Sequence, residues 1–218
     1  MHVCLIPAAG FGKRLGAPAA KEMLLDPENG KPLIDWSLEL AFEMGLKPVV
    51  ISRFEKASFN SYLLQKKGVE LLLIENSQEW PDTILKSYSR WGDVNLMLLP
   101  DTRFAPRELI RDLVVSCEAG VDASFGIFKT TETLDSWGVL ERAGEKLRIC
   151  EKPRFYSASE NVAPWGLIAF RKQVGEKLFS DLLNSNQTHG WFDWRGSHSL
   201  FHLDSFKDIT RKISDLEF

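Results

Sequence analysis

The stretch PAAGFGKRLG at residues 7–16 is the segment best suited to bind an anion. Its small residues let the backbone approach a ligand closely, and the N–H groups of such a loop can line an anion site. Arg14 adds a positive charge to this loop, and Lys21 adds another seven residues later. Glycines alone are typical of an ordinary turn, but the two cations favour a phosphate site. A dinucleotide fingerprint and a P-loop are excluded, because G-x-G-x-x-G and G-x-x-x-x-G-K-[ST] are absent.

A carboxylate follows an apolar run in LMLLPDTRF at residues 96–104, where the run stops at Pro100 and Asp101. A carboxylate at the tip of a central strand, near a basic loop, is suited to hold a divalent cation against phosphate oxygens. Asp101 would equally suit an N-cap or a turn, which is the commoner role of Asp after a strand. The residues alone leave both interpretations open.

Other candidate groups have ordinary explanations. Glu151 and Lys152, taken alone, fit an exposed ion pair at a strand end, worth about 0 to 1 kcal/mol. His198 and His202 have the i, i+4 spacing of zinc ligands on a helix, but SHSLFHLD predicts a strand and offers no third ligand at a suitable spacing. The aromatic stretch GWFDWRG at residues 190–196 is typical of a core or an interface.

The elements that must position these residues follow from the apolar pattern, in which short strands and amphipathic helices alternate up to residue 128. Strands are predicted at residues 2–8, 48–52, 69–74, 95–99 and 123–128, and helices at residues 33–44, 56–67, 81–91 and 107–119. This alternation predicts an α/β fold with a mainly parallel, Rossmann-like sheet flanked by helices. Ligands of such sheets bind beyond the carboxyl ends of the strands, where residues 7–16 and Asp101 both fall.

The second half of the chain follows another rhythm. Strands are predicted at residues 138–141, 147–150 and 167–170, and a helix at residues 173–183, which gives this half an α+β character. No linker rich in Pro, Ser or Gly, no internal repeat and no low-complexity tract separates the halves. We therefore expect one domain over residues 1–218, made of a first half at 1–128 and a second half at 129–218.

The composition is that of a soluble globular protein, with 218 residues, 44% of them apolar and 26% charged. Because 27 basic residues face 30 acidic ones, no strong field attracts nucleic acid or a membrane surface. No apolar run is long enough to cross a bilayer, and the N-terminal stretch is too short for a signal peptide. The cysteines Cys4, Cys117 and Cys150 lack C-x-x-C spacing, which predicts reduced, buried thiols and a cytoplasmic protein. The sequence leaves open whether the protein forms a homo-oligomer.

Seven motifs in one order resemble those of the sugar-1-phosphate nucleotidyltransferases, the nucleoside-diphosphate-sugar pyrophosphorylases typified by glucose-1-phosphate thymidylyl- and uridylyltransferases. They are PAAGFGKRL with KEML (21–24), GKPLIDWSL (30–38), PDT (100–102), WGVLE (137–141), EKP (151–153), WGLIAF (165–170) and LDSFKD (203–208). The resemblance implies the nucleotide-diphospho-sugar transferase fold, with a nucleotide-binding half at 1–128 and a sugar-binding half at 129–218. It also implies an Mg²⁺-dependent enzyme. Its substrates would be a nucleoside triphosphate, with dTTP or UTP favoured, and a sugar 1-phosphate, and it would release pyrophosphate and a nucleotide sugar.

The resemblance also implies roles for residues on the nucleotide side of the site. The triphosphate would be bound by the loop after the first strand, the reacting phosphates by a lysine, and the base by a side-chain amide. The residues that match these family positions are Ala9, Gly10, Gly12 and Arg14 for the loop, Lys21 for the phosphates and Gln78 for the base. Arg14, Lys21 and Asp101 are the implied catalytic residues.

On the acceptor side, the resemblance implies that Gly138, Glu151 and Gly166 contact the sugar and that Lys152 meets the sugar phosphate. The two glycines would equally suit bulges or turns. Asp101 and Asp204 would together hold Mg²⁺, with Asp204 ending a late strand at residues 198–203. If they do not meet, Asp204 would instead cap a helix at residues 206–213.

Two motifs depart from the family pattern, because the usual G-D-N is PDT here and LDSFKD lacks the usual Gly-Thr-Pro. Two alternatives therefore stay open. One is a cytidylyltransferase that acts on a phosphate other than a sugar phosphate, and the other is a catalytically silent protein that binds nucleotide sugars. Arg14, Lys21, Asp101 and Lys152 are all present, which argues against the silent alternative.

Overall fold

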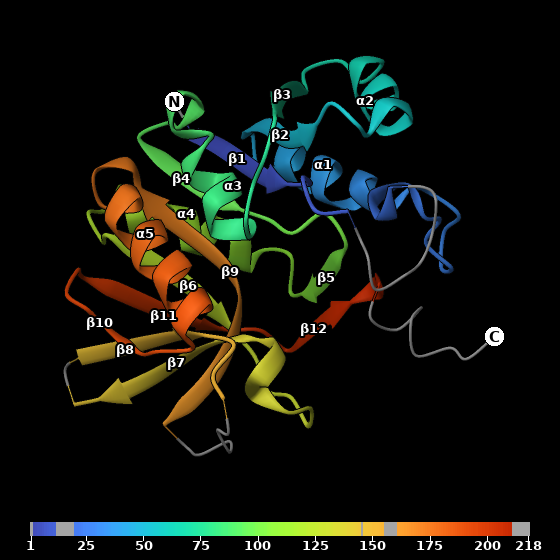
Figure 1. Cartoon of the computed structure of the whole chain (residues 1–218). Helices are drawn as coiled ribbons and strands as arrows, with labels where there is room; N and C mark the ends of the chain where they lie inside the picture. Colours follow the sequence, from blue (N-terminus) through green and yellow to red (C-terminus); the bar gives the residue numbers. More distant parts are fainter. Residues whose placement is uncertain (1, 12–19, 145, 155–160, 211–218) are drawn as a thin grey trace.

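The computed structural model describes residues 2–11, 20–144, 146–154 and 161–210 (Figure 1). The strands are β1 (His2–Pro7), β2 (Lys47–Arg53), β3 (Glu70–Ile74), β4 (Val94–Met97), β5 (Thr102–Ala105), β6 (Ala123–Ile127), β7 (Gly138–Ala143), β8 (Lys146–Glu151), β9 (Val162–Arg171), β10 (Phe192–Trp194), β11 (His198–His202) and β12 (Ser205–Asp208). The helices are α1 (Leu33–Glu43), α2 (Ala57–Leu64), α3 (Trp80–Leu85), α4 (Leu109–Glu118) and α5 (Lys172–Thr188), with 3-10 turns η2 (Lys21–Met23), η3 (Tyr88–Arg90) and η4 (Leu134–Ser136).

The main sheet has ten strands, and its longest path runs β10-β8-β7-β9-β4-β1-β2-β3. Strands β4, β1, β2 and β3 are parallel, as the βα alternation predicted. Strands β10, β8, β7 and β9 pair in antiparallel fashion, which gives the second half its different rhythm. The predicted fold class, a largely parallel sheet with helices and an α+β second half, is confirmed.

Strand β9 joins the two parts of the sheet. Its residues 162–165 pair with β7, and its residues 168–171 pair with β4. Its other edge pairs with β6, which in turn pairs with β11. A single strand is thus hydrogen-bonded to three others, and it connects the parallel and antiparallel regions directly.

Helices cover both faces of the sheet, which explains why the central strands are apolar without alternation. In β1, Cys4 and Ile6 pack in one core with residues of α1, α2 and α4. Val3 and Leu5 point to the other face and pack with residues of α3 and α5. Figure 1 shows α5 crossing one face of the sheet, with α1 and α2 beside β1 and β2.

The structure differs from the predicted elements where pairing is long-range. The helix predicted at residues 81–91 is two pieces, α3 and η3, and β9 is ten residues long where four were predicted. Short β5, β10 and β12 were not predicted, because few apolar residues mark them. The alternative of a helix beginning at residue 206 is wrong, because residues 205–208 form β12, antiparallel to β5, and helical residues begin only at 209. None of the helices within the described ranges is long and apolar enough to cross a membrane.

Candidate functional site

The carboxyl ends of β1, β2 and β4 meet at one edge of the sheet, and the loop after β1 begins there. Ala8 continues the β1–β2 pairing by donating its N–H to the Ile51 carbonyl at 2.8 Å, and both Ala8 and Ala9 are buried. Gly10 is exposed, and a Cβ built on it would meet no atom within 4 Å. Gly12 and Arg14 lie outside the described residues. A side chain at position 10 would therefore meet no neighbour among the described atoms, and the sequence places a phosphate at this loop.

Lys21 and Asp101 meet at this edge of the sheet, although 80 residues separate them in sequence. Lys21 Nζ donates to Asp101 Oδ2 at 2.5 Å, and Asp101 is only 5% exposed. Thr210 Oγ1 donates to the same oxygen at 3.0 Å. Burial lowers the pKa of Lys21, but the adjacent Asp101 carboxylate outweighs burial and holds that pKa above its usual range. The predicted phosphate-binding lysine and the predicted metal ligand are thus in direct contact.

A buried ion pair lies behind this contact and was not foreseen from the sequence. Lys56 Nζ bonds both carboxylate oxygens of Glu22 at 2.9 Å and the Ala8 carbonyl at 2.6 Å. Burial raises the pKa of Glu22 and lowers that of Lys56, and the attraction between the two charges offsets these shifts in part. The pair ties η2, which carries Lys21, to the end of β1. The only feature of the sequence that could have pointed to this ion pair is the position of Glu22 next to Lys21.

The second carboxylate near Asp101 is Asp208 and not Asp204. The β5–β12 register places Asp208 opposite Thr102, next to Asp101. Thr210 Oγ1 also lies 2.8 Å from Asp208 Oδ1, so its single proton is shared between the two carboxylates. Asp204 is exposed, and its N–H bonds the Ala105 carbonyl at the other end of the ribbon. Because residues along a strand rise about 3.4 Å each, Asp204 lies too far along β12 to share an ion with Asp101.

This donor set fits a magnesium ion. Mg²⁺ is usually held by one or two carboxylates together with substrate phosphates, and it keeps several waters. Asp101 and Asp208, linked through Thr210, supply two carboxylates beside the predicted triphosphate loop. Within the described ranges, no group of three or more His, Cys, Asp or Glu side chains could hold a metal by itself. Phosphate oxygens and waters would therefore have to supply the remaining ligands.

The predicted acceptor residues gather around the ends of β7 and β8. Glu151 is 4% exposed, and the Trp80 indole donates to its Oε1 at 3.1 Å. A Cβ on Gly138 would lie 2.6 Å from Glu151 Oε2 and 2.5 Å from Trp165 Nε1, so only glycine fits there. Burial raises the pKa of Glu151, and the Trp80 hydrogen bond opposes this shift. Trp80, at the start of α3, was missed because a tryptophan outside the family motifs carries no signal for this contact.

Lys152 follows Glu151 in a strained turn. Its φ is +55°, in the left-handed region that side chains other than those of Gly and Asn rarely adopt. Its backbone N–H bonds the Trp137 carbonyl at 3.0 Å, and its Nζ lies 3.6 Å from Glu79 Oε2. His189 Nδ1 donates to the Lys152 carbonyl at 2.8 Å. The amine is thus presented beside the loop that leads to α3.

That loop contains Gln78, the predicted base-reading residue. Gln78 is exposed, and its side-chain oxygen accepts from Gln187 of α5 at 2.8 Å. Arg53, at the end of β2, donates to the Ser77 carbonyl at 2.8 Å, and its guanidinium lies 4.6 Å from the centre of the Phe11 ring. Arg53 and Phe11 were not predicted, and they border the space between the phosphate loop and Gln78.

Gly166 has a packing role. A Cβ there would approach ring atoms of Phe206 to 2.1 Å. Phe206 stacks on Phe128 with ring centres 4.6 Å apart. The glycine therefore lets β12 lie against β9, and a contact between Gly166 and a sugar stays a prediction.

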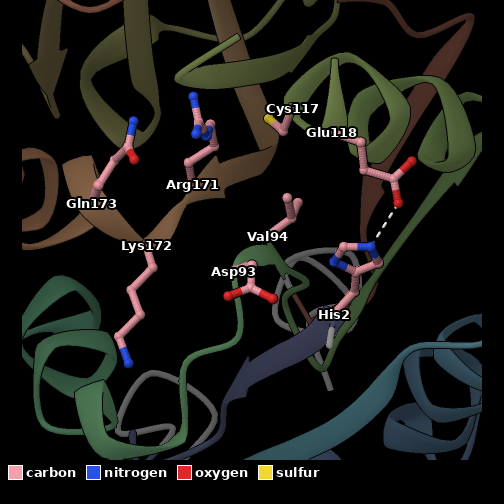
Figure 2. Close-up of a pocket in the computed structure, with 8 residues that line it drawn as sticks. All are labelled: His2, Asp93, Val94, Cys117, Glu118, Arg171, Lys172 and Gln173. Atoms are coloured by element: carbon pink, nitrogen blue, oxygen red, sulfur yellow. Dashed lines mark ion pairs between the residues drawn. The ribbon is translucent and has the colours of Figure 1, made fainter. Parts of the chain in front are cut away.

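A separate hollow of about 590 Å³ lies at the opposite ends of β1 and β4 (Figure 2). His2 and Glu118 form an ion pair across it at 2.6 Å. Lys172 points away from this pair, and its amine lies 4.7 Å from the centre of the Tyr88 ring. The hollow is remote from the strand ends that carry the predicted site, so the candidate site is the group of residues around Lys21 and Asp101 at the carboxyl ends.

No family model matches the chain. Similar curated proteins include the 2-C-methyl-D-erythritol 4-phosphate cytidylyltransferase of Shewanella loihica, 22% identical over 217 residues (95% of this chain, 85% of that protein). The enzyme of the same name from Bacillus thuringiensis is 29% identical over 169 residues (73% of this chain, 74% of that protein). The bifunctional protein GlmU of Thermotoga petrophila is 26% identical over 149 residues, 67% of this chain and 32% of that protein.

Solved structures with this fold include a Bacillus anthracis protein assigned as a glucose-1-phosphate thymidylyltransferase, in complex with sucrose. Its TM-score is 0.75 at 15% identity, and the match covers 100% of this chain and 97% of that one. A UTP-bound UGPase from Acinetobacter baumannii matches with a TM-score of 0.73 at 17% identity, over 99% of this chain and 91% of that one.

Proposed function

Because the chain has the nucleotide-diphospho-sugar transferase fold and is a nucleotidyltransferase, as its motifs predicted, we propose that it joins a nucleoside triphosphate to a sugar 1-phosphate. The reaction would release pyrophosphate and a nucleotide sugar. The observation that carries the proposal is the contact between Lys21 and Asp101 at the carboxyl ends of β1 and β4, beside a loop of small residues.

Nucleotidyl transfer requires cationic and hydrogen-bond-donating groups of the kind found around Lys21. A sugar phosphate is already an ionised nucleophile, so its attack on the α-phosphorus needs alignment and charge neutralisation more than a general base. Lys21 would donate to oxygens of the reacting phosphates, and the amides after Ala8 would bind the rest of the triphosphate. The buried Glu22–Lys56 pair would hold η2 and the end of β1 in register while this happens.

Asp101 and Asp208 would hold Mg²⁺ together with phosphate oxygens. When bound, the ion would neutralise charge on the triphosphate and on its pyrophosphate leaving group. The pairing of Lys21 with Asp101 implies that this carboxylate would exchange the amine for the ion, which would free Lys21 to reach a phosphate.

We propose a pyrimidine triphosphate as donor. A side-chain amide both donates and accepts, which suits the edge of a pyrimidine, and Gln78 is exposed next to Ser77, whose carbonyl binds Arg53. The solved structure from Acinetobacter baumannii contains UTP, and the curated relatives include cytidylyltransferases, so pyrimidine nucleotides recur among similar proteins. Glu151 and Lys152 would bind the sugar and its phosphate. A cytoplasmic location stays a prediction, and so does a homo-oligomer.

The test is a screen for pyrophosphate release. UTP, dTTP, CTP, ATP and GTP would each be offered with a panel of sugar 1-phosphates and Mg²⁺, with and without excess chelator. The proposal expects turnover with a pyrimidine triphosphate and its loss in chelator. Turnover in excess chelator would show that the reaction does not need a metal ion. No pyrophosphate release with any substrate pair would refute the proposed reaction.

The second candidate is a cytidylyltransferase acting on a phosphate other than a sugar phosphate. The names of the curated relatives, 2-C-methyl-D-erythritol 4-phosphate cytidylyltransferases, favour it. One added arm decides between the two candidates: CTP with 2-C-methyl-D-erythritol 4-phosphate. Pyrophosphate release in that arm alone would replace the main proposal by this one.

A further inference from the structure

We infer that the last turn of α5 is a positioning device for the acceptor phosphate, acting through Ser185 and His189 on Glu151 and Lys152. The inference rests on the proposed function, in which Glu151 and Lys152 bind the sugar and its phosphate. Neither Ser185 nor His189 lies in a motif of the resemblance.

The first contact is made by Ser185, which is 3% exposed. Its Oγ accepts the backbone N–H of Glu151 at 2.9 Å and donates to the Gly190 carbonyl at 2.6 Å. The hydroxyl thus accepts a hydrogen bond from β8 and donates one to the segment that follows α5. Because a hydroxyl has one proton, this arrangement fixes the direction of both bonds.

The second contact is made by His189, which ends α5 in the left-handed conformation at φ +54°. Its Nδ1 donates to the Lys152 carbonyl at 2.8 Å, and Cys150 Sγ lies 3.5 Å from the His189 carbonyl. Three consecutive residues, Cys150 to Lys152, are therefore all bonded to the end of one helix.

Strained backbone at Lys152 and His189 indicates that these contacts serve a function. Within the described part of the chain, Lys152 and His189 are the two residues other than glycine with positive φ, and they are bonded to each other. Such conformations persist only where surrounding contacts hold them, and they are concentrated at functional sites. Glycine would adopt either turn freely, yet a lysine and a histidine stand there. The side chains must therefore contribute something that glycine cannot.

That contribution is the placement of the Lys152 amine. The left-handed turn directs the chain out of β8 just after Glu151, and the amine ends near Glu79 in the loop before α3. If the His189 tether were lost, Lys152 could relax toward ordinary φ and carry its amine away. A displacement of about 1 Å at such a group is enough to lower a rate about a hundredfold.

The test compares S185A and H189G with S180A, a matched control on an exposed position of the same helix. Glycine accepts the left-handed turn, so H189G keeps the helix end and loses only the ring. For each variant we would measure the KM for the acceptor, the affinity for the triphosphate by calorimetry, and the exchange rate of the Glu151 and Lys152 amides.

We expect S185A and H189G to raise the acceptor KM about tenfold or more, to leave triphosphate affinity within about twofold, and to speed amide exchange at residues 151 and 152. S180A should change none of these. Unchanged acceptor KM, with or without faster exchange, would overturn the inference, and so would an equal loss of triphosphate affinity. An inactive parent protein would instead show that the proposed function has failed.

Discussion

Lys21 is the residue on which the proposed chemistry depends most directly. Its side chain is 25% exposed, so the amine can reach a ligand, yet Asp101 holds it at 2.5 Å. A charge-assisted bond of this length keeps the amine protonated and oriented. The site therefore contains a cation that is already in place and needs only to change partners.

We predict that K21A lowers turnover about a hundredfold, which is the usual loss when one charged donor to a transition state is removed. K31A is the matched control, because Lys31 is exposed and pairs with Glu39 on the surface of α1. Steady-state kinetics would measure both variants, and thermal unfolding would confirm that each is folded. Near-normal turnover in K21A would reduce Lys21 to a structural partner of Asp101.

A second prediction at this scale concerns Glu151, because burial of its carboxyl group makes the free energy of unfolding depend on pH. Burial raises the pKa of Glu151 above its ordinary 4.5. Between the unfolded and the folded pKa, the folded state binds more protons, so stability falls as pH rises through that window. E151Q should remove this loss and keep an acceptor for the Trp80 indole.

We therefore expect E151Q to unfold at least about 2 °C above the parent protein at pH 7, the shift that about 1 kcal/mol gives in a chain of this size. At pH 4 the difference should shrink. Thermal unfolding at both pH values would measure it, with E55Q as an exposed control. A gap that is the same at pH 4 and pH 7 would contradict the account.

At the scale of elements, the β5–β12 ribbon brings the C-terminal part of the described chain to the candidate site around Lys21 and Asp101. The ribbon places Asp208 and Thr210 beside Asp101. It is seated against the main sheet where Phe206 covers Gly166. The position of a candidate metal ligand thus depends on one aromatic ring over one glycine.

G166A should therefore destabilise the protein by about 1 to 3 kcal/mol, the usual cost of forcing a methyl group into a packed core. F206A should be destabilising for the opposite reason, because it leaves a hole between Gly166 and Phe128. The double variant G166A/F206A should lose less than the sum of the two, because the methyl group then has room. Denaturant unfolding would measure this cycle, and strict additivity would show that the two positions do not interact.

The same ribbon marks the limit of prediction from sequence. β1 was predicted because apolar residues on both faces mark it. Asp101 was expected at a strand end, and it lies in the turn between β4 and β5, four residues after β4 ends. Asp204 was predicted instead of Asp208 because a motif gives an order of residues, whereas register decides which of two aspartates faces Thr102. Lys56 and Trp80 were missed because each makes its important contact with a residue more than 30 positions away.

At the scale of the whole molecule, β9 decides whether the two halves behave as one. It is hydrogen-bonded to β4 and β6 of the first half (residues 1–128) and to β7 of the second half (residues 129–218). Unfolding either half would expose an edge of the strand that the other half needs. A single domain over residues 1–218 is a prediction that this arrangement supports.

We expect one calorimetric transition, with equal calorimetric and van't Hoff enthalpies, as for a two-state domain. Differential scanning calorimetry measures both enthalpies in one experiment. Two resolved transitions, or a van't Hoff enthalpy near half of the calorimetric value, would show that the halves unfold separately despite β9.

The buried thiols make the same question accessible chemically. Cys4 in β1, Cys117 in α4 and Cys150 in β8 are all buried, and burial raises the pKa of each thiol. Since the thiolate is the reactive form, an alkylating reagent can modify these sulfurs only in molecules that have opened. Each half thus contains a cysteine whose alkylation reports when that half opens. Because β9 joins the halves, they should open together, and Cys4 and Cys150 would be alkylated with one rate constant.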